Sequence, residues 1–476
     1  MSEFKKIVKG SLLVFISMTL AYLFGYLSKV VLARYLGPSQ LGLYALSLTV
    51  LYIFTSFAIS GFGTSLTYFY SKERRKKEFV STIFLTSFLI LLIISITILM
   101  FPNLLHILFN NENLISLAWL ISIFILFYGL TRISFSVLRG QERAGMYALF
   151  NLSIPTLYLI ALLFLKVRLA YHALLLYVLV YILIGSVVIL KFIKNNLTKP
   201  NFSLLKKVFP FTVVLFLVEI LFQFRRWTDV WMLSWLSNLS NIGFYSVAIS
   251  TAFAFNAVLL AFNFLYLPVS TRLLNQNKLH ELRRIYNKIC FLITLVIAPF
   301  CVLLFVFASQ FIRIVFGKTY LASVFPFRIL TLAVLINSMF GPNWTNLVAK
   351  GEKKILVFLA IFTLLLNVIL NYFMIPMWDI VGAATATAIS IISWNILTSY
   401  ILWIKQRMTP FSKDMIKSLV ISVSLVIPLV FLSILYNFSL IYAALLSVVY
   451  LGAYVFFINM HVIRIKEIFN YLLSIS

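Results

Sequence analysis

The sequence predicts an all-α polytopic membrane protein of about fourteen transmembrane helices, in two six-helix lobes related by a parallel pseudo-repeat plus two C-terminal helices. The 476 residues are 63% hydrophobic and 11% charged, with a mean hydropathy of +1.06. No water-soluble fold of this size can bury so much apolar surface. Apolar runs long enough to cross a bilayer repeat along the chain, and the basic residues collect between them.

The apolar runs define the predicted spans, since a bilayer core about 30 Å thick needs roughly 20 apolar residues in a helix. The spans are residues 11–33, 41–70, 79–101, 114–137, 146–165, 171–190, 208–233, 242–270, 285–308, 321–346, 355–375, 380–404, 415–435 and 439–460. The first run follows Lys5, Lys6 and Lys9 and lacks a cleavage site, so we interpret it as an uncleaved span.

The distribution of Lys and Arg predicts the orientation. If both termini are cytoplasmic, the inside segments hold 29 of the 39 basic residues and the outside segments hold five. Cytoplasmic segments of membrane proteins are enriched in Lys and Arg. We therefore predict a multi-pass protein of the plasma membrane with both termini in the cytoplasm. The net charge of +27 is explained by orientation and indicates no nucleic-acid partner.

The chain also resembles itself. "LGLYA" at Leu41 recurs as "IGFYS" at Ile242, and the basic turn "RGQER" at Arg139 recurs as "KGEKK" at Lys350. "FNNENLISLA" from Phe109 aligns loosely with "FGKTYLASVF" further on. The order of these matches predicts an N-terminal lobe at 1–195, a C-terminal lobe at 196–410 and two extra helices with a tail at 411–476.

One predicted span carries four ionisable side chains. "EILFQFRRWTDVWML" contains Glu219, Arg225, Arg226 and Asp229, each costing about 2.5 kcal/mol or more at mid-bilayer unless compensated. On a helical wheel Glu219 and Arg226 share one strip, and Arg225 and Asp229 lie on an adjoining strip. The other side is expected to face lipid and holds Leu221, Phe224, Trp227 and Trp231. The alternatives are a functional site or a structural ion-pair network between helices.

Three further cations lie within predicted spans: Lys29, Arg132 and Arg328. With Arg225 and Arg226 they exceed the two acids, and buried charges should be paired. A surplus of positive charge invites an anionic ligand, and the Arg fork suits phosphate oxygens. The alternative for Lys29 and Arg328 is snorkelling to the interface, and for Arg132 it is interfacial anchoring.

Several classes of site have no motif in the sequence. There is no GxxxxGK[ST] loop for a nucleotide and no HExxH, and the four histidines are scattered. Cys290 and Cys301 give neither a disulfide framework nor a metal-ligand spacing. The sequence thus predicts no enzyme, cofactor, metal or nucleotide.

Three longer stretches resemble a known family: "KVVLARYLGPSQLGLYALS" from Lys29, "TDVWMLSWLSNLSNIGFYSVA" from Thr228 and "LNVILNYFMIPMWDIVGAATATAIS" from Leu366. They resemble the polysaccharide transporter family, the O-antigen type oligosaccharide flippases of the multidrug/oligosaccharidyl-lipid/polysaccharide exporter superfamily. The resemblance implies a flippase that carries polyprenyl-diphosphate-linked oligosaccharide to the outer leaflet by alternating access between two lobes. Lys29 and Asp229 match the family's basic position late in span one and acidic position late in span seven.

On this hypothesis, Arg225 and Arg226 bind the diphosphate, aided by Lys29, Arg132 and Arg328. Asp229 and Glu219 balance these charges or titrate in a cycle coupled to H⁺ or Na⁺. The alternatives are a lipid II flippase, a multidrug antiporter of the same superfamily, and a membrane glycosyltransferase or ligase. The surplus of cations disfavours an antiporter for cationic drugs.

Overall fold

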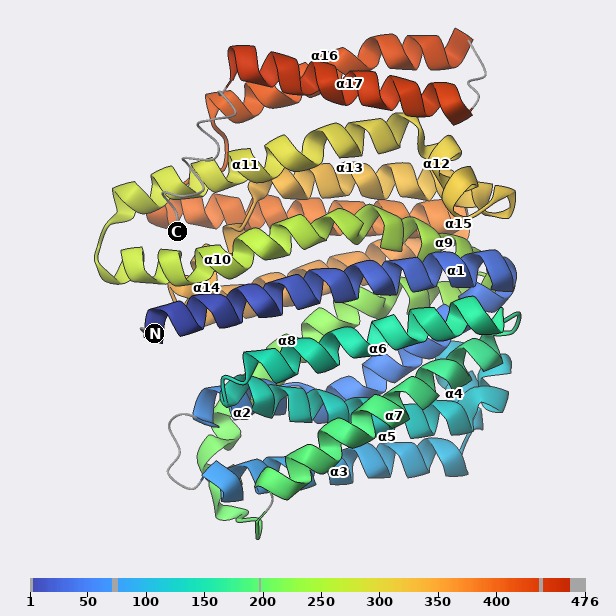
Figure 1. The fold of residues 1–476 in the computed structure, drawn as a ribbon, viewed down its shortest axis with the longest axis vertical. Helices are drawn as coiled ribbons and strands as arrows, with labels where there is room; N and C mark the ends of the chain where they lie inside the picture. The colour runs from blue at the N-terminus through green and yellow to red at the C-terminus, as the bar shows by residue number, and fades with distance from the viewer. Residues whose placement is uncertain (1–2, 71–75, 197, 436–439, 463–476) are drawn as a thin grey trace. The chain divides into compact units, whose positions relative to one another are not determined.

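The computed structural model describes residues 3–70, 76–196, 198–435 and 440–462 (Figure 1). Every regular element within these ranges is a helix, which confirms the predicted all-α class. Proximity of Cα atoms groups the chain into two compact units. Unit 1 holds the described residues up to Val247 together with Asn367–Ala383, and unit 2 holds Ala248–Leu366 and the described residues from Ala384 onward. The predicted lobe boundaries at 195 and 410 describe a repeat, which grouping by proximity does not test, so they stay a prediction.

Unit 1 contains most of the first half of the chain. Its helices are α1 (Glu3–Ile59), α2 (Phe62–Tyr70), α3 (Lys76–Met100), α4 (Asn103–Phe109), α5 (Asn113–Gly140), α6 (Ala144–Leu165), α7 (Ala170–Asn196), α8 (Ser203–Leu236), the first part of α9 (Leu239–Ala252) and the middle of α15 (Lys353–Gln406). Within it, α5 packs against α3, α7 and α1, and α6 packs along α1.

Unit 2 contains the later helices. They are η1 (Phe253–Phe255), α10 (Asn256–Asn275), α11 (Leu279–Val306), α12 (Ala308–Val315), η2 (Lys318–Ser323), α13 (Val324–Phe340), α14 (Asn343–Ala349), the two ends of α15, α16 (Lys413–Leu435) and α17 (Leu440–His461). Here α11 packs against α13 and α16.

Ten helical stretches among the described residues are long and apolar enough to cross a membrane. Of these, α15 contains two of the predicted spans, and α1 contains the first predicted span and part of the second, 41–70, which continues into α2. In both helices the two spans are joined through a sharp kink. In α1 the kink is at Gly37 (φ 73°), and in α15 it is at Asp379 (φ 50°). A glycine tolerates positive φ at no steric cost, and Pro38 follows it. The protein is therefore a polytopic membrane protein, and the count of fourteen spans stays a prediction.

The two copies of the repeated "G-[LF]-Y" motif contact each other inside unit 1. A Cβ atom at Gly42 of α1 would overlap the carbonyl oxygen of Leu239, and one at Gly243 of α9 would overlap the carbonyl oxygen of Pro38. The contact is reciprocal, because Leu239 lies four residues before Gly243 and Pro38 lies four residues before Gly42. The backbones of α1 and α9 can approach this closely only because both positions lack a side chain.

Candidate functional site

Asp229 lies in the last third of α8 and is 3% exposed. Its carboxylate accepts hydrogen bonds from the Tyr245 hydroxyl at 2.5 Å, from Asn371 Nδ2 at 2.9 Å and from Asn367 Nδ2 at 3.2 Å. A buried carboxylate is costly unless it is hydrogen-bonded in this way. The middle segment of α15 thus supplies two amides to an acid on α8, and α9 supplies a phenol.

The two amides form a polar pair of their own. Asn367 and Asn371 are one helical turn apart, and Asn371 Nδ2 also donates to Asn367 Oδ1 at 3.1 Å. The side-chain oxygen of Asn371 is buried and accepts no hydrogen bond from the described residues. Both asparagines lie in the stretch from Leu366 that resembles the family, and the sequence predicts no role for them. Their i, i+4 spacing in an apolar span was the signal that could have found them.

Glu219 has a different setting near the middle of the same helix. Its carboxylate accepts hydrogen bonds from the backbone N–H of Gly61 at 3.0 Å and from the Thr64 hydroxyl at 2.6 Å. Both donors lie at the start of α2, where backbone N–H groups lack partners within the helix and favour negative charge. Close beside them, the Ser65 and Thr212 hydroxyls are 2.8 Å apart.

An aromatic platform lies beside Arg226, one residue along α8. The platform consists of Tyr52, Tyr128 and Trp227: the Tyr52 and Trp227 rings stack with centroids 4.7 Å apart, and Tyr128 meets Tyr52 edge-on at 5.4 Å. Arg132 of α5 lies 5.9 Å from the Tyr128 ring centroid, a cation–π distance. The charges of Arg132 and Arg226 both act on the Tyr52 phenol.

Both arginine side chains next to the platform are exposed, whereas the platform rings are only half-buried. Below Arg132, Ser136 Oγ donates to the Arg132 carbonyl at 3.2 Å and accepts from Arg139 Nη2 at 3.1 Å. Ser136 therefore links the backbone of Arg132 to the side chain of Arg139 on α5.

The expectation that the opposite side of α8 faces lipid is wrong. Trp227 stacks on Tyr52, and the indole N–H of Trp231 donates to the Leu108 carbonyl at 2.8 Å. Trp235 Nε1 donates to the same carbonyl at 3.0 Å. An indole N–H inside a membrane protein needs an acceptor, and the end of α4 provides one.

The remaining predicted cations have separate settings. Arg225 is half-buried, lies 5.9 Å from the Phe222 ring and is within electrostatic range of Arg226 and Asp229. Lys29 is half-buried in α1 and forms no hydrogen bond or ion pair that the described part of the chain provides. Arg328 belongs to unit 2, where its guanidinium donates to the Phe305 and Val306 carbonyls at the end of α11 at 3.0 and 3.4 Å.

The arrangement in unit 1 combines two kinds of chemistry. Exposed arginines beside aromatic rings suit an anionic group attached to sugars, because guanidinium forks bind phosphate and ring faces pack against sugars. A buried carboxylate with amide oxygens suits a proton or a monovalent cation. No group of three or more His, Cys, Asp or Glu that could hold a metal ion occurs among the residues described.

Comparisons with known proteins give one family and one fold. Residues 31–325 match the family described as "Polysaccharide biosynthesis protein". The chain is 25% identical over 401 residues to the "Probable low-salt glycan biosynthesis flippase Agl15" of Haloferax volcanii, covering 81% of this chain and 82% of that protein.

Two solved structures illustrate the fold. The "Lipid II flippase MurJ, inward closed conformation" has a TM-score of 0.76 and 19% identity, covering 94% of this chain and 99% of that one. The "Inward-facing conformation of a multidrug resistance MATE family transporter of the MOP superfamily" has a TM-score of 0.64 and 15% identity, covering 83% of this chain and 98% of that one. At these identities the likeness concerns the fold.

Proposed function

The chain belongs to the polysaccharide biosynthesis protein family, and on that premise we propose that it is a flippase for a lipid-linked glycan. The named relative, a probable flippase of glycan biosynthesis that aligns over 81% of the chain, supports the proposal. The substrate is a polyprenyl-diphosphate-linked oligosaccharide, carried from the cytoplasmic to the outer leaflet. Transport, rather than a change in covalent bonds, fits a chain made almost entirely of apolar helices.

The observation that carries the proposal is the pair of exposed arginines beside the aromatic platform. Arg132 and Arg226 are exposed, both act on Tyr52, and neither forms an ion pair with an acid among the described residues. A diphosphate supplies the missing negative charge, and the rings of Tyr52 and Trp227 supply a surface for the first sugar. Arg225 and Lys29 extend the positive field. Arg328 is the weakest of the five, since its donors are already directed at two carbonyls.

Asp229 is the proposed coupling residue. Three side chains donate to it, and the side-chain oxygen of Asn371, which accepts no hydrogen bond from the described residues, lies in the same buried cluster. Loss or gain of H⁺ or Na⁺ at this carboxylate would change the hydrogen bonds that join α8, α9 and α15. Such a change gives two arrangements that an ion can select, as alternating access requires.

Transport in proteoliposomes tests the proposal. A fluorescent polyprenyl-diphosphate oligosaccharide is added to vesicles holding wild type or Arg132→Gln/Arg226→Gln at equal folded protein. We expect the double variant to lose about tenfold or more of the initial rate, because two charge-assisted contacts are removed. The matched control, Arg313→Gln/Lys318→Gln, removes two exposed cations elsewhere and should transport normally.

Other substrates separate the alternatives in the same vesicles. Transport of lipid II at the same rate would identify a lipid II flippase, and coupled efflux of a cationic drug would identify an antiporter. Release of free polyprenyl diphosphate would identify a glycosyltransferase or ligase. Equal transport by wild type and the arginine double variant would overturn the assignment of the site.

A further inference from the structure

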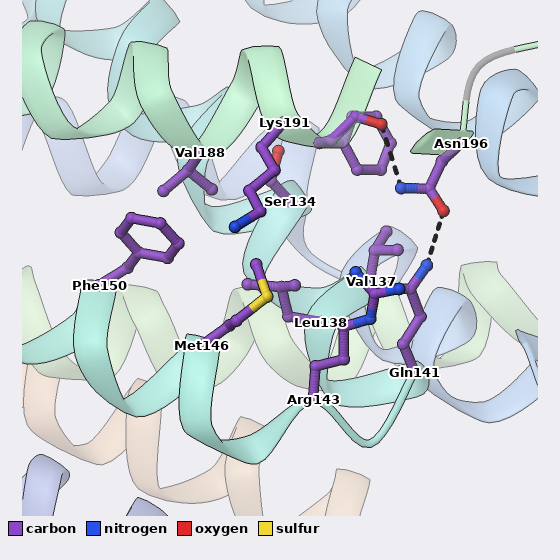
Figure 2. A pocket seen from close by; sticks show the side chains of 11 residues that line it. Ser134, Val137, Leu138, Gln141, Arg143, Met146, Phe150, Val188, Lys191 and Asn196 are labelled. Atoms are coloured by element: carbon purple, nitrogen blue, oxygen red, sulfur yellow. Dashed lines mark hydrogen bonds between the residues drawn. The ribbon is translucent and has the colours of Figure 1, made fainter. Parts of the chain in front are cut away.

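A pocket with two basic side chains lies in unit 1, at the ends of three helices. It is lined by side chains of α5, α6, α7 and the turn between α5 and α6, namely Ser134, Val137, Leu138, Gln141, Arg143, Met146, Phe150, Val188, Lys191, Phe192 and Asn196 (Figure 2). The glycan flippase proposed above makes no use of these residues. From its charge, its polar wall and its position we propose that this pocket binds the headgroup of an anionic phospholipid.

The charge of the pocket is one-sided. Arg143 and Lys191 are both exposed, and none of the residues lining the pocket is acidic. The guanidinium of Arg143 can take two phosphate oxygens and the ammonium of Lys191 a third. Basic pockets between transmembrane helices on the cytoplasmic side are sites where anionic headgroups bind.

The polar wall is held in place by its own hydrogen bonds. Gln141 Nε2 donates to Asn196 Oδ1 at 2.6 Å, and Asn196 Nδ2 donates to the Phe192 carbonyl at 3.0 Å (Figure 2). Asn196 is 7% exposed. This pair joins the end of α5 to the end of α7, so the wall is formed before a ligand arrives. A preformed site loses less free energy on ordering than a flexible one.

The other wall of the pocket is apolar and continues onto the lipid-facing surface. Met146, Phe150 and Val188 line it. Leu149, next to Phe150 in the chain, and Leu190, two residues after Val188, are 62% and 65% exposed, as expected for side chains that contact lipid tails. The pocket therefore lies where an apolar helix surface meets a basic end, which is the level of lipid headgroups. The sequence predicts that this end faces the cytoplasm, where anionic lipids are concentrated.

Lipid binding to the purified full chain tests the site. The protein is placed in phosphatidylcholine nanodiscs, phosphatidylglycerol is titrated in, and retained lipid is measured by native mass spectrometry. We expect preferential retention of phosphatidylglycerol by wild type, weakened about tenfold in Arg143→Gln/Lys191→Gln, because two phosphate contacts are lost. The charge-preserving Arg143→Lys/Lys191→Arg should bind to within about twofold of wild type.

A matched control uses the opposite end of the same helix pair. Lys166→Gln/Arg168→Gln removes the same charge from the exposed connection between α6 and α7 and should leave binding unchanged. Equal phosphatidylglycerol binding by the Arg143/Lys191 variant, or an equal loss in this control, would overturn the site. Displacement of the bound lipid by polyprenyl diphosphate, or by inorganic phosphate, would also overturn it. These outcomes do not depend on whether the protein transports a glycan.

Discussion

Glu219 and Asp229 are two acids on one helix with opposite surroundings. Glu219 is held by a backbone N–H and a hydroxyl at the start of α2, and Asp229 by one phenol and two amides. The backbone donor cannot turn away without unfolding a helix end, whereas side chains can change rotamer. We infer that Glu219 fixes the position of α2 on α8 and that Asp229 takes part in a change of state. The predictions below test this contrast.

The largest effect is expected for Asp229→Asn. The variant keeps the size of the side chain but removes its charge. Its new amide N–H group would face the amide N–H donors of Asn367 or Asn371, so a hydrogen bond is replaced by a contact between two donors. Ion-coupled transport of the lipid-linked glycan should fall about tenfold to a hundredfold. Initial rates in proteoliposomes with an imposed ion gradient measure this. Normal gradient-dependent transport by a folded Asp229→Asn protein would remove Asp229 from the cycle.

A smaller effect is expected for Asn371→Ala. The change removes one donor to Asp229 and the oxygen that accepts no hydrogen bond, so the ion concentration for half-maximal transport should rise about fivefold. Transport measured against H⁺ or Na⁺ concentration gives that value. Asn395→Ala in unit 2 is the control, since it also loses buried amide hydrogen bonds. If both variants change stability and neither changes ion dependence, the cluster is structural.

Glu219→Gln should affect stability more than transport. The neutral amide accepts weaker hydrogen bonds from Gly61 and Thr64, which lowers the free energy of unfolding by roughly 1–2 kcal/mol. Thermal unfolding of the purified protein in detergent measures the loss. Transport per folded molecule should stay within about twofold of wild type. A transport defect as large as that of Asp229→Asn would end the distinction between the two acids.

The smallest effect is expected for Arg328→Gln in unit 2. Its guanidinium caps the last carbonyls of α11 and lies 5.7 Å from the Phe305 ring. We expect a loss of about 1 kcal/mol in the free energy of unfolding and unchanged apparent affinity for the lipid-linked substrate. Unfolding and the substrate dependence of transport are compared with those of Arg226→Gln. A matching loss of affinity in both variants would return Arg328 to the diphosphate site.

The helical architecture could be predicted from the sequence because hydropathy reports directly on a membrane span. Most described residues of the predicted spans lie on helices, and the gap predicted between residues 33 and 41 is a kink at Gly37 within α1. The setting of the charges could not be predicted in the same way. Asp229 is 138 residues from Asn367 in the chain, and no periodicity reports such a contact.

The same limit explains the error on Trp231. Helical periodicity separates the charged side of a helix from its apolar side. It does not show whether the apolar side contacts lipid or another part of the protein. An indole N–H at that depth predicts an acceptor without naming it, and the acceptor is the Leu108 carbonyl of a short helix in the first half of the chain. Arg328 is a similar case, because its partners are carbonyls that carry no sequence signal.

The contact between Gly42 and Gly243 has a consequence for how this chain can vary over time. The two copies of the repeated motif pack against each other at Gly42 and Gly243. Neither glycine can be replaced by a residue with a side chain unless the backbone of the other helix moves away. A Gly42→Ala change would overlap a carbonyl of α9, and no larger residue at 243 could relieve it. Positions 42 and 243 are therefore both expected to remain glycine when the rest of the sequence varies.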